Sequence, residues 1–160
     1  MELNPYARFL DDLEPILVVT ATVERLHALI DSLSLAQADR NPAPGKWSIR
    51  EIVAHLADCE IVFAVRLRQT LAEEHHFIQP FDQVRWAERY AAYDLKTAFE
   101  TFAAIRNWNL KFLLTVTADD RHHPVTHAER GTMILWTIVE TIAGHDINHL
   151  QQIERLVAQA

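Results

Sequence analysis

The stretch Ala143–Leu156, AGHDINHLQQIERL, places His145 and His149 four residues apart inside a strongly helical pattern. On a helix that turns about 100° per residue, His149 and His145 lie about 20° and 60° from Ile142, the centre of the apolar stripe. The same stripe contains Leu135, Ile138, Ile153 and Leu156. Both imidazoles are therefore expected to face the interior of a helical bundle.

A second helix carries another inward-facing histidine. Ser48 and Glu51 have the spacing of a capping box, in which each side chain satisfies an end amide of the helix. The apolar pattern then runs to about Glu74 and places His55 at the edge of the apolar arc, near Cys59. Three histidines on two helices are thus predicted to point into one core.

The heights of the histidines agree only if the two helices run in opposite directions. His55 follows the cap at Ser48 by about 10 Å, and His149 precedes Val157 by about 12 Å, at 1.5 Å per residue. Parallel packing would separate the imidazoles by more than roughly 10 Å. A shared site therefore requires antiparallel packing of the second and last helices.

The whole pattern predicts an all-α four-helix bundle in one domain spanning residues 1–160. Helices are expected at about residues 14–33, 48–74, 94–114 and 132–157, with no convincing strand. The connection over residues 75–93 could reach roughly 60 Å when extended, enough to return along the second helix. The order up-down-down-up is therefore expected, and it places the second and last helices antiparallel.

Composition excludes several classes of function. The 160 residues carry a net charge of −7, the wrong sign for a protein that binds the nucleic-acid backbone or an anionic membrane surface. No apolar run approaches the length of a bilayer span, and the acidic start does not resemble a signal peptide. Cys59 is the single cysteine, which favours a reducing compartment. We expect a cytoplasmic protein.

Two histidines at i and i+4 plus one from a neighbouring helix are a common way to build a metal site. Imidazole suits zinc, nickel, iron and copper. The alternative is that His55, His145 and His149 are hydrogen-bonded core residues, because the HxxxH spacing alone is a weak signal. Cys59, one turn from His55, is either a fourth ligand or a small buried apolar residue.

Charged residues near the stripe have two interpretations each. Asp146 could hydrogen-bond a ligand imidazole or act as a base, or it could be a partly exposed acid paired with a neighbouring helix. Glu60 and Arg66 are expected to form an ion pair with each other or with Arg106, or else to contact a substrate carboxylate. The histidines of the loops are interpreted as surface residues: His75, His76, His122, His123 and His127.

The segments GKWSIREIVAHLADCEIVFAVRL (45–67) and ETIAGHDINHLQQIERL (140–156) resemble the two signature helices of the DinB/YfiT-like superfamily of metalloenzymes. The resemblance covers about residues 26–156. It implies a four-helix bundle with a long second crossover, frequent homodimers, and one divalent ion, typically nickel, zinc or manganese. Carried over by position, it implies the ligands His55, His145 and His149.

The resemblance also implies a class of reaction. Characterised members of the superfamily include thiol-dependent transferases and isomerases that use bacillithiol, mycothiol or glutathione. The first expectation is therefore a metal-dependent enzyme that activates a low-molecular-weight thiol, or water, for transfer to a small electrophile. The alternatives are a metal-dependent hydrolase and a non-catalytic helical dimer that binds a metal or a small ligand.

Overall fold

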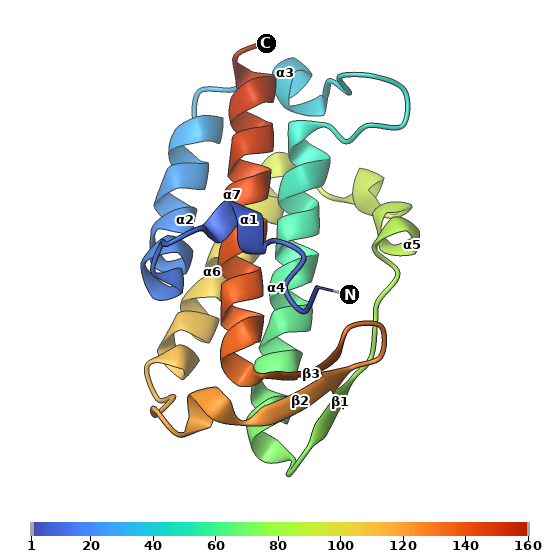
Figure 1. Ribbon diagram of the computed structural model, residues 1–160. Coiled ribbons are helices and arrows are strands. Elements are labelled where there is room, and N and C mark those ends of the chain that lie inside the picture. The colour runs from blue at the N-terminus through green and yellow to red at the C-terminus, as the bar shows by residue number, and fades with distance from the viewer. Residues whose placement is uncertain (1, 160) are drawn as a thin grey trace.

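A computed structural model describes residues 2–159 of the chain, and four long helices dominate it (Figure 1). The long helices are α2 (Pro15–Ile30), α4 (Ile49–Ala72), α6 (Leu95–Leu113) and α7 (Leu135–Val157). The short helical segments are α1 (Ala7–Leu10), α3 (Leu35–Asp39), α5 (Gln83–Ala87), η1 (Tyr90–Ala92) and η2 (Asp120–His122). The four-helix bundle predicted from the sequence is confirmed. The single domain over residues 1–160 stays a prediction, and its first and last residues lie outside the described ones.

The starts of two long helices follow from their capping residues. Ser48 Oγ accepts from the Glu51 amide at 3.2 Å, and the Glu51 carboxylate accepts from the Ser48 amide at 2.8 Å. The predicted capping box is therefore present and begins α4. Asp94 caps α6 in a simpler way, with its carboxylate accepting from the Thr97 amide at 2.7 Å.

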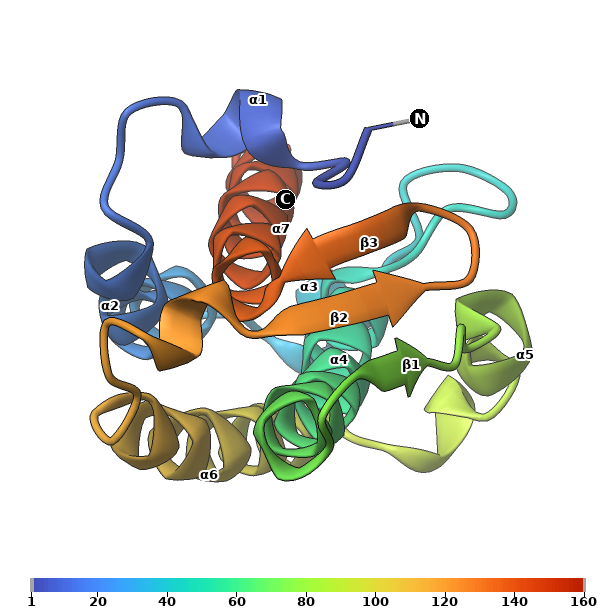
Figure 2. The same ribbon diagram turned by 60° about the horizontal axis from the view of Figure 1, so that its bottom comes forward.

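A small sheet at one end of the bundle was not predicted. Its strands are β1 (His76–Ile78), β2 (Pro124–His127) and β3 (Gly131–Ile134), in the order β1-β2-β3 (Figure 2). β1 pairs parallel with β2, and β2 pairs antiparallel with β3. Strands of three or four residues are too short to show a clear alternating pattern in a sequence. The predicted start of the last helix at residue 132 is accordingly wrong, because residues 131–134 form β3.

The sheet shows in which direction the helices run. β1 follows the C-terminal end of α4 and β3 leads directly into the N-terminal end of α7, so α4 and α7 run in opposite directions (Figure 1). α6 ends near the same sheet, because η2 and then β2 follow it along the chain. β1, α5 and η1 lie in the long connection between α4 and α6, which carries the chain back along α4.

A layer of buried polar residues divides the core of the bundle. The apolar cluster at the sheet end includes Phe63 and Ile142, and the cluster at the other end includes Leu56 and Leu150. Between them lie buried polar side chains, namely His55, Glu60, Arg106, His145, Asp146 and His149. Within residues 2–159, no helix is both long enough and apolar enough to cross a membrane.

Candidate metal centre

His55 on α4 and His145 on α7 meet inside the bundle. Their Nε2 atoms lie 3.2 Å apart, and the two side chains are almost completely buried. This contact joins residues that are 90 positions apart in the sequence. The antiparallel packing required by the heights of the histidines therefore brings the two helices together at the expected level.

His149 lies one turn further along α7, with its ring beside those of His55 and His145. The ligand atoms that all lie within 4.8 Å of one another are, however, those of His55, Cys59 and His145. The ring centroid of His149 is 4.4 Å from that of His145 and 5.0 Å from that of His55. His149 Nδ1 is 3.0 Å from Gln152 Oε1, an oxygen that can only accept. Nδ1 therefore carries the proton, and the lone pair of the neutral ring is on Nε2.

Cys59 belongs to the same cluster. Its Sγ is 3.5 Å from His55 Nε2 and 3.8 Å from His145 Nε2. The ligand atoms of His55, Cys59 and His145 all lie within 4.8 Å of one another. From the sequence, Cys59 could be either a metal ligand or a buried apolar residue. The structure places its Sγ close enough to both Nε2 atoms to share an ion with them.

The spacing of these atoms fits a single divalent ion. Two nitrogens bound at about 2.1 Å, with an angle between 90° and 109°, would lie roughly 3.0–3.4 Å apart. The observed separation of 3.2 Å between the His55 and His145 nitrogens falls in this interval. A thiolate bound at about 2.3 Å in the same tetrahedron would lie roughly 3.6 Å from each nitrogen, close to the position of Cys59.

The imidazoles are neutral at physiological pH. Burial, followed by the nearby His149, lowers the pKa of His55 to about 3. Burial also lowers the pKa of His149 to about 4, and it lowers the pKa of His145 well below its ordinary value. Neutral rings keep the lone pairs that a metal ion requires.

Aromatic rings surround the cluster. Trp47 lies beside His55, with ring centroids 4.8 Å apart, and Tyr6 meets His145 edge-on at 5.1 Å. Phe63 also lies near His145, with ring centroids 6.2 Å apart. These rings shield the imidazoles from bulk water, which is consistent with their small exposed fractions.

A buried ion-pair network lies behind the histidines. Arg106 on α6 binds both carboxylate oxygens of Asp146, at 2.6 and 3.0 Å, and the Glu60 carboxylate at 2.7 Å. Thr22 donates to Asp146 at 2.8 Å, and Asn109 donates to Glu60 at 3.0 Å. Burial alone would lower the pKa of Arg106, but the two carboxylates outweigh it and raise the pKa above its ordinary value.

The network decides between the interpretations of Glu60 and Asp146. Glu60 pairs with Arg106 rather than with Arg66. Asp146 pairs with a neighbouring helix, as one interpretation held, but it is buried rather than partly exposed. Both oxygens of Asp146 accept from Arg106. The carboxylate therefore anchors α7 to α6 beside His145 and does not face the imidazoles.

One of the loop histidines was assigned wrongly. His127, expected at the surface, is buried in β2, with 4% of the residue exposed. Tyr6 and Gln152, which contact His145 and His149, were not predicted from the sequence. Gly144 is the sequence feature that could have indicated the contact with Tyr6, because a glycine inside a helix often marks a close packing contact. Gly144 is buried beneath Tyr6.

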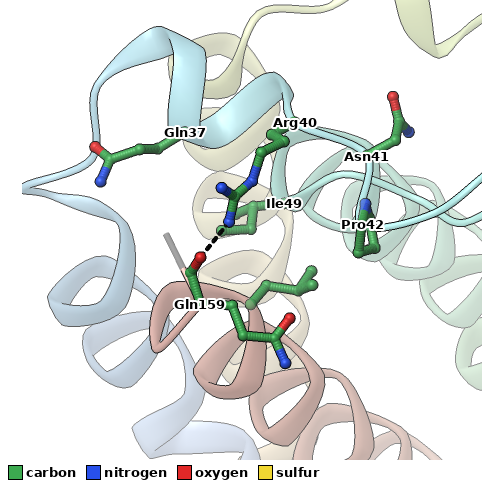
Figure 3. Close-up of a pocket in the computed structure, with 7 residues that line it drawn as sticks. Gln37, Arg40, Asn41, Pro42, Ile49 and Gln159 are labelled. Atoms are coloured by element: carbon green, nitrogen blue, oxygen red, sulfur yellow. Dashed lines mark hydrogen bonds between the residues drawn. The ribbon is translucent and has the colours of Figure 1, made fainter.

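A separate pocket of about 290 Å³ lies beyond the histidines, at the end of the bundle opposite the sheet (Figure 3). Leu156, which lines it, follows His149 by about 10 Å along α7. Arg40 donates to the backbone carbonyl of Gln159 across this pocket. The pocket includes none of the candidate ligands and is not part of the candidate metal centre.

Comparison with known families assigns the chain to a family. A sequence model of the DinB superfamily matches residues 19–153, which is most of the chain. The chain therefore belongs to the DinB superfamily, and the resemblance noted from the sequence is confirmed.

Two similar proteins are each described as a "putative metal-dependent hydrolase". The one from Oceanobacillus iheyensis is 28% identical over 126 residues, which are 78% of this chain and 73% of that protein. The one from Bacillus pumilus is 28% identical over 141 residues, which are 84% of this chain and 78% of that protein.

A solved structure has the same fold. YfiT from Bacillus subtilis is described as "a probable metal-dependent hydrolase with an unusual four-helix bundle topology". It superimposes with a TM-score of 0.84 over 91% of this chain and 85% of that chain, at 22% sequence identity. At this identity the likeness establishes the four-helix bundle and leaves the chemistry to the site.

Proposed function

We propose that the protein is a metal-dependent hydrolase in which His55, His145 and His149 hold one divalent ion. The observation that carries this proposal is the convergence of neutral imidazoles from α4 and α7, with two Nε2 atoms 3.2 Å apart. The descriptions of the similar proteins from Oceanobacillus iheyensis and Bacillus pumilus support hydrolysis as the reaction. The imidazole ligands suit nickel or zinc, and manganese is the third ion that the resemblance to the family implies.

The proposal includes the up-down-down-up order of the long helices that the sequence predicts. In this order α4 and α7 run in opposite directions, which is consistent with the meeting of His55 and His145 at one level. A divalent ion bound there supplies Lewis acidity, which lowers the pKa of water to about 7 and polarises a substrate carbonyl or phosphoryl group.

The chain's own residues prepare the site for this chemistry. Gln152 accepts from His149 Nδ1 and so keeps the lone pair of that ring on Nε2. The pair between Asp146 and Arg106 fixes the part of α7 that carries His145. Tyr6 and Trp47 pack beside the imidazoles and shield them from bulk water. Asp146 is accordingly a positioning residue in this proposal, and no side chain is assigned as the general base.

Cys59 is expected to stay outside the ligand set, although it lies within reach. Catalytic metal sites keep an open position for water or substrate, and three imidazoles leave such a position free. A fourth protein ligand would instead close the site, as in structural zinc centres.

Metal content tests the ligand assignment. Protein produced without a histidine tag or a nickel resin is analysed for metals by plasma mass spectrometry. We expect about one divalent ion per chain, loss of the ion in His149→Ala, and retention in Cys59→Ala. Circular dichroism shows whether both variants remain folded. If His149→Ala keeps its ion while Cys59→Ala loses it, the three-histidine assignment is wrong.

Activity tests separate hydrolysis from thiol transfer and from a non-catalytic role. The metal-loaded protein is assayed with activated carboxyl and phosphoryl esters and with an electrophile, with and without a low-molecular-weight thiol. Hydrolysis without thiol that disappears in His149→Ala supports the proposal. Turnover that requires thiol supports the transferase alternative. A lack of turnover across the panel supports a non-catalytic helical protein.

A further inference from the structure

The turn between β2 and β3 lies at one end of the sheet (Figure 2), and three basic residues belong to this part of the molecule. In the register of the sheet, His127 of β2 is the partner of Ile78. Arg66 Nη2 on α4 donates to the carbonyl of the next residue, Gln79, at 3.4 Å. Arg130 follows in the turn, and its amide donates to the His127 carbonyl at 3.2 Å. Arg66, His127 and Arg130 are therefore neighbours.

The two arginines of this basic group have no ion-pair partner among the described residues, and the acid beside the group is Glu129, whose charge acts on His127. Within residues 2–159, neither Arg66 nor Arg130 forms an ion pair, and the Arg130 side chain has no hydrogen bond. The Nε atom of Arg66 is buried without a partner. Burial, and then the like charge of Arg130, lowers the pKa of Arg66 to about 10. Arg106, in contrast, is neutralised by two carboxylates.

His127 adds a third donor to this group. Its Nδ1 accepts from the Glu129 amide at 3.2 Å, so the proton of the neutral ring is on Nε2. Burial, followed by Arg130 and Arg66, lowers the pKa of His127 against the smaller opposing effect of Glu129, and this favours the neutral form. Two guanidinium groups and one imidazole N–H then offer only donors, which suits an anion.

The basic group lies between the candidate metal centre and an apolar groove. Cys59, Phe63 and Arg66 stand at i, i+4 and i+7 on one face of α4, and the guanidinium carbon of Arg66 is 6.0 Å from the Phe63 ring. Phe63 in turn contacts His145 of the cluster. On its other side, Arg66 lines a groove of about 320 Å³ together with Phe81 and Trp86.

We propose that Arg66, Arg130 and His127 bind the acid group of an amphiphilic substrate, whose apolar part lies on Phe81 and Trp86. This inference rests on the proposed function, because it describes the substrate that the metal centre would act on. A carboxylate matches the planar fork of a guanidinium, and a phosphate presents oxygens in the same spacing. The orphaned Arg66 Nε atom then has an acceptor.

Binding to the metal-free protein tests this proposal independently of the metal. Isothermal titration at pH 7.5 compares 3-phenylpropionate with its neutral analogue 3-phenylpropan-1-ol, and phenyl phosphate serves as the phosphate arm. We expect at least one acid to bind about ten-fold or more tightly than the alcohol. Arg66→Gln and Arg130→Gln should each weaken acid binding about ten-fold and leave alcohol binding unchanged, whereas Arg66→Lys retains part of the affinity.

Arg121→Gln is the matched control, because this exposed arginine stacks on Trp136 and its replacement removes the same charge elsewhere. It should bind the acids like the unmodified protein. Equal binding of acid and alcohol, or unchanged acid binding in Arg66→Gln and Arg130→Gln, overturns the proposal. Acid binding that requires the ion and disappears in His149→Ala also overturns it, because the acid then sits on the metal. Failure of the metal proposal alone leaves acid binding to the metal-free protein intact.

Discussion

At the scale of single residues, the orientation of each imidazole is as important as its position. His149 differs from the other two histidines because Gln152 holds its Nδ1 at 3.0 Å. Partners of this kind select the tautomer of a ligand and increase its basicity. Gln152 faces His149 from the next turn of α7, whereas its neighbour Gln151 is exposed.

Replacing Gln152 with alanine should weaken metal binding without removing the site. We expect the dissociation constant of the ion to rise about 10–100-fold, because His149 loses the contact that holds its lone pair on Nε2. Competition with a chromophoric chelator measures the change. Gln151→Ala is the control and should match the unmodified protein. Equal affinities in the two variants would show that Gln152 does not act on the site.

At the scale of elements, the bundle is joined by a charged network as well as by apolar packing. Arg106 of α6 connects Glu60 of α4 with Asp146 of α7, and it also donates to the Val19 carbonyl of α2 at 2.9 Å. One guanidinium thus contacts all of the other three long helices. The network lies in the same polar layer as the histidines and links their packing to the fold.

Removal of this guanidinium should be strongly destabilising. Arg106→Ala leaves two carboxylates buried without a cation, which costs about 3–5 kcal/mol of unfolding free energy. Urea denaturation measures this loss. Arg25→Ala breaks an exposed pair with Glu154 at 3.3 Å and should cost less than about 1 kcal/mol. Similar losses in the two variants would contradict the role assigned to the network.

The contact between the N-terminal segment and α7 depends on Gly144. A Cβ at this position would lie 2.5 Å from the Tyr6 carbonyl oxygen, so the backbone of one segment would have to move. Gly144→Ala should therefore cost about 1–3 kcal/mol through overpacking, more than alanine contributes through its helix propensity. It should also displace Tyr6 from His145, seen as a change in Tyr6 ring resonances. A stabilised variant with unchanged resonances would refute the contact.

At the scale of the whole molecule, the buried histidines make global stability depend on pH. In the unfolded chain they titrate near pH 6.5, but burial lowers the pKa of folded His55 to about 3 and that of His149 to about 4. At a pH between the folded and the unfolded pKa of a histidine, the unfolded state binds more protons than the folded state. Their effect on stability is therefore absent above pH 6.5, and stability falls as the pH decreases toward 4.

The metal-free protein should show this dependence in urea denaturation between pH 7.5 and 4.5. We expect a loss approaching 1.4 kcal/mol per pH unit for each histidine below pH 6, on the order set by one proton per residue. His149→Gln should reduce the slope of stability against pH by the contribution of about one proton. Stability that stays level or increases on acidification would contradict the buried, neutral state of the cluster.

The homodimer and the cytoplasmic location implied at the outset stay predictions at this scale. The family assignment and the bundle are confirmed, and the antiparallel approach of α4 and α7 accounts for the meeting of His55 with His145. The strands were missed because each has three or four residues and pairs with a segment distant in sequence. Local periodicity carries no information about such partners.

The sequence alone determined the long helices and the inward faces of His55, His145 and His149, because helical periodicity and capping act between residues a few positions apart. Only the tertiary structure decided the choice among charged partners. Arg106 is bound by Glu60 and Asp146, while within residues 2–159 Arg66 and Arg130 form no ion pair. These interactions depend on distances between atoms far apart along the chain, and such distances exist only once the helices and the sheet have packed.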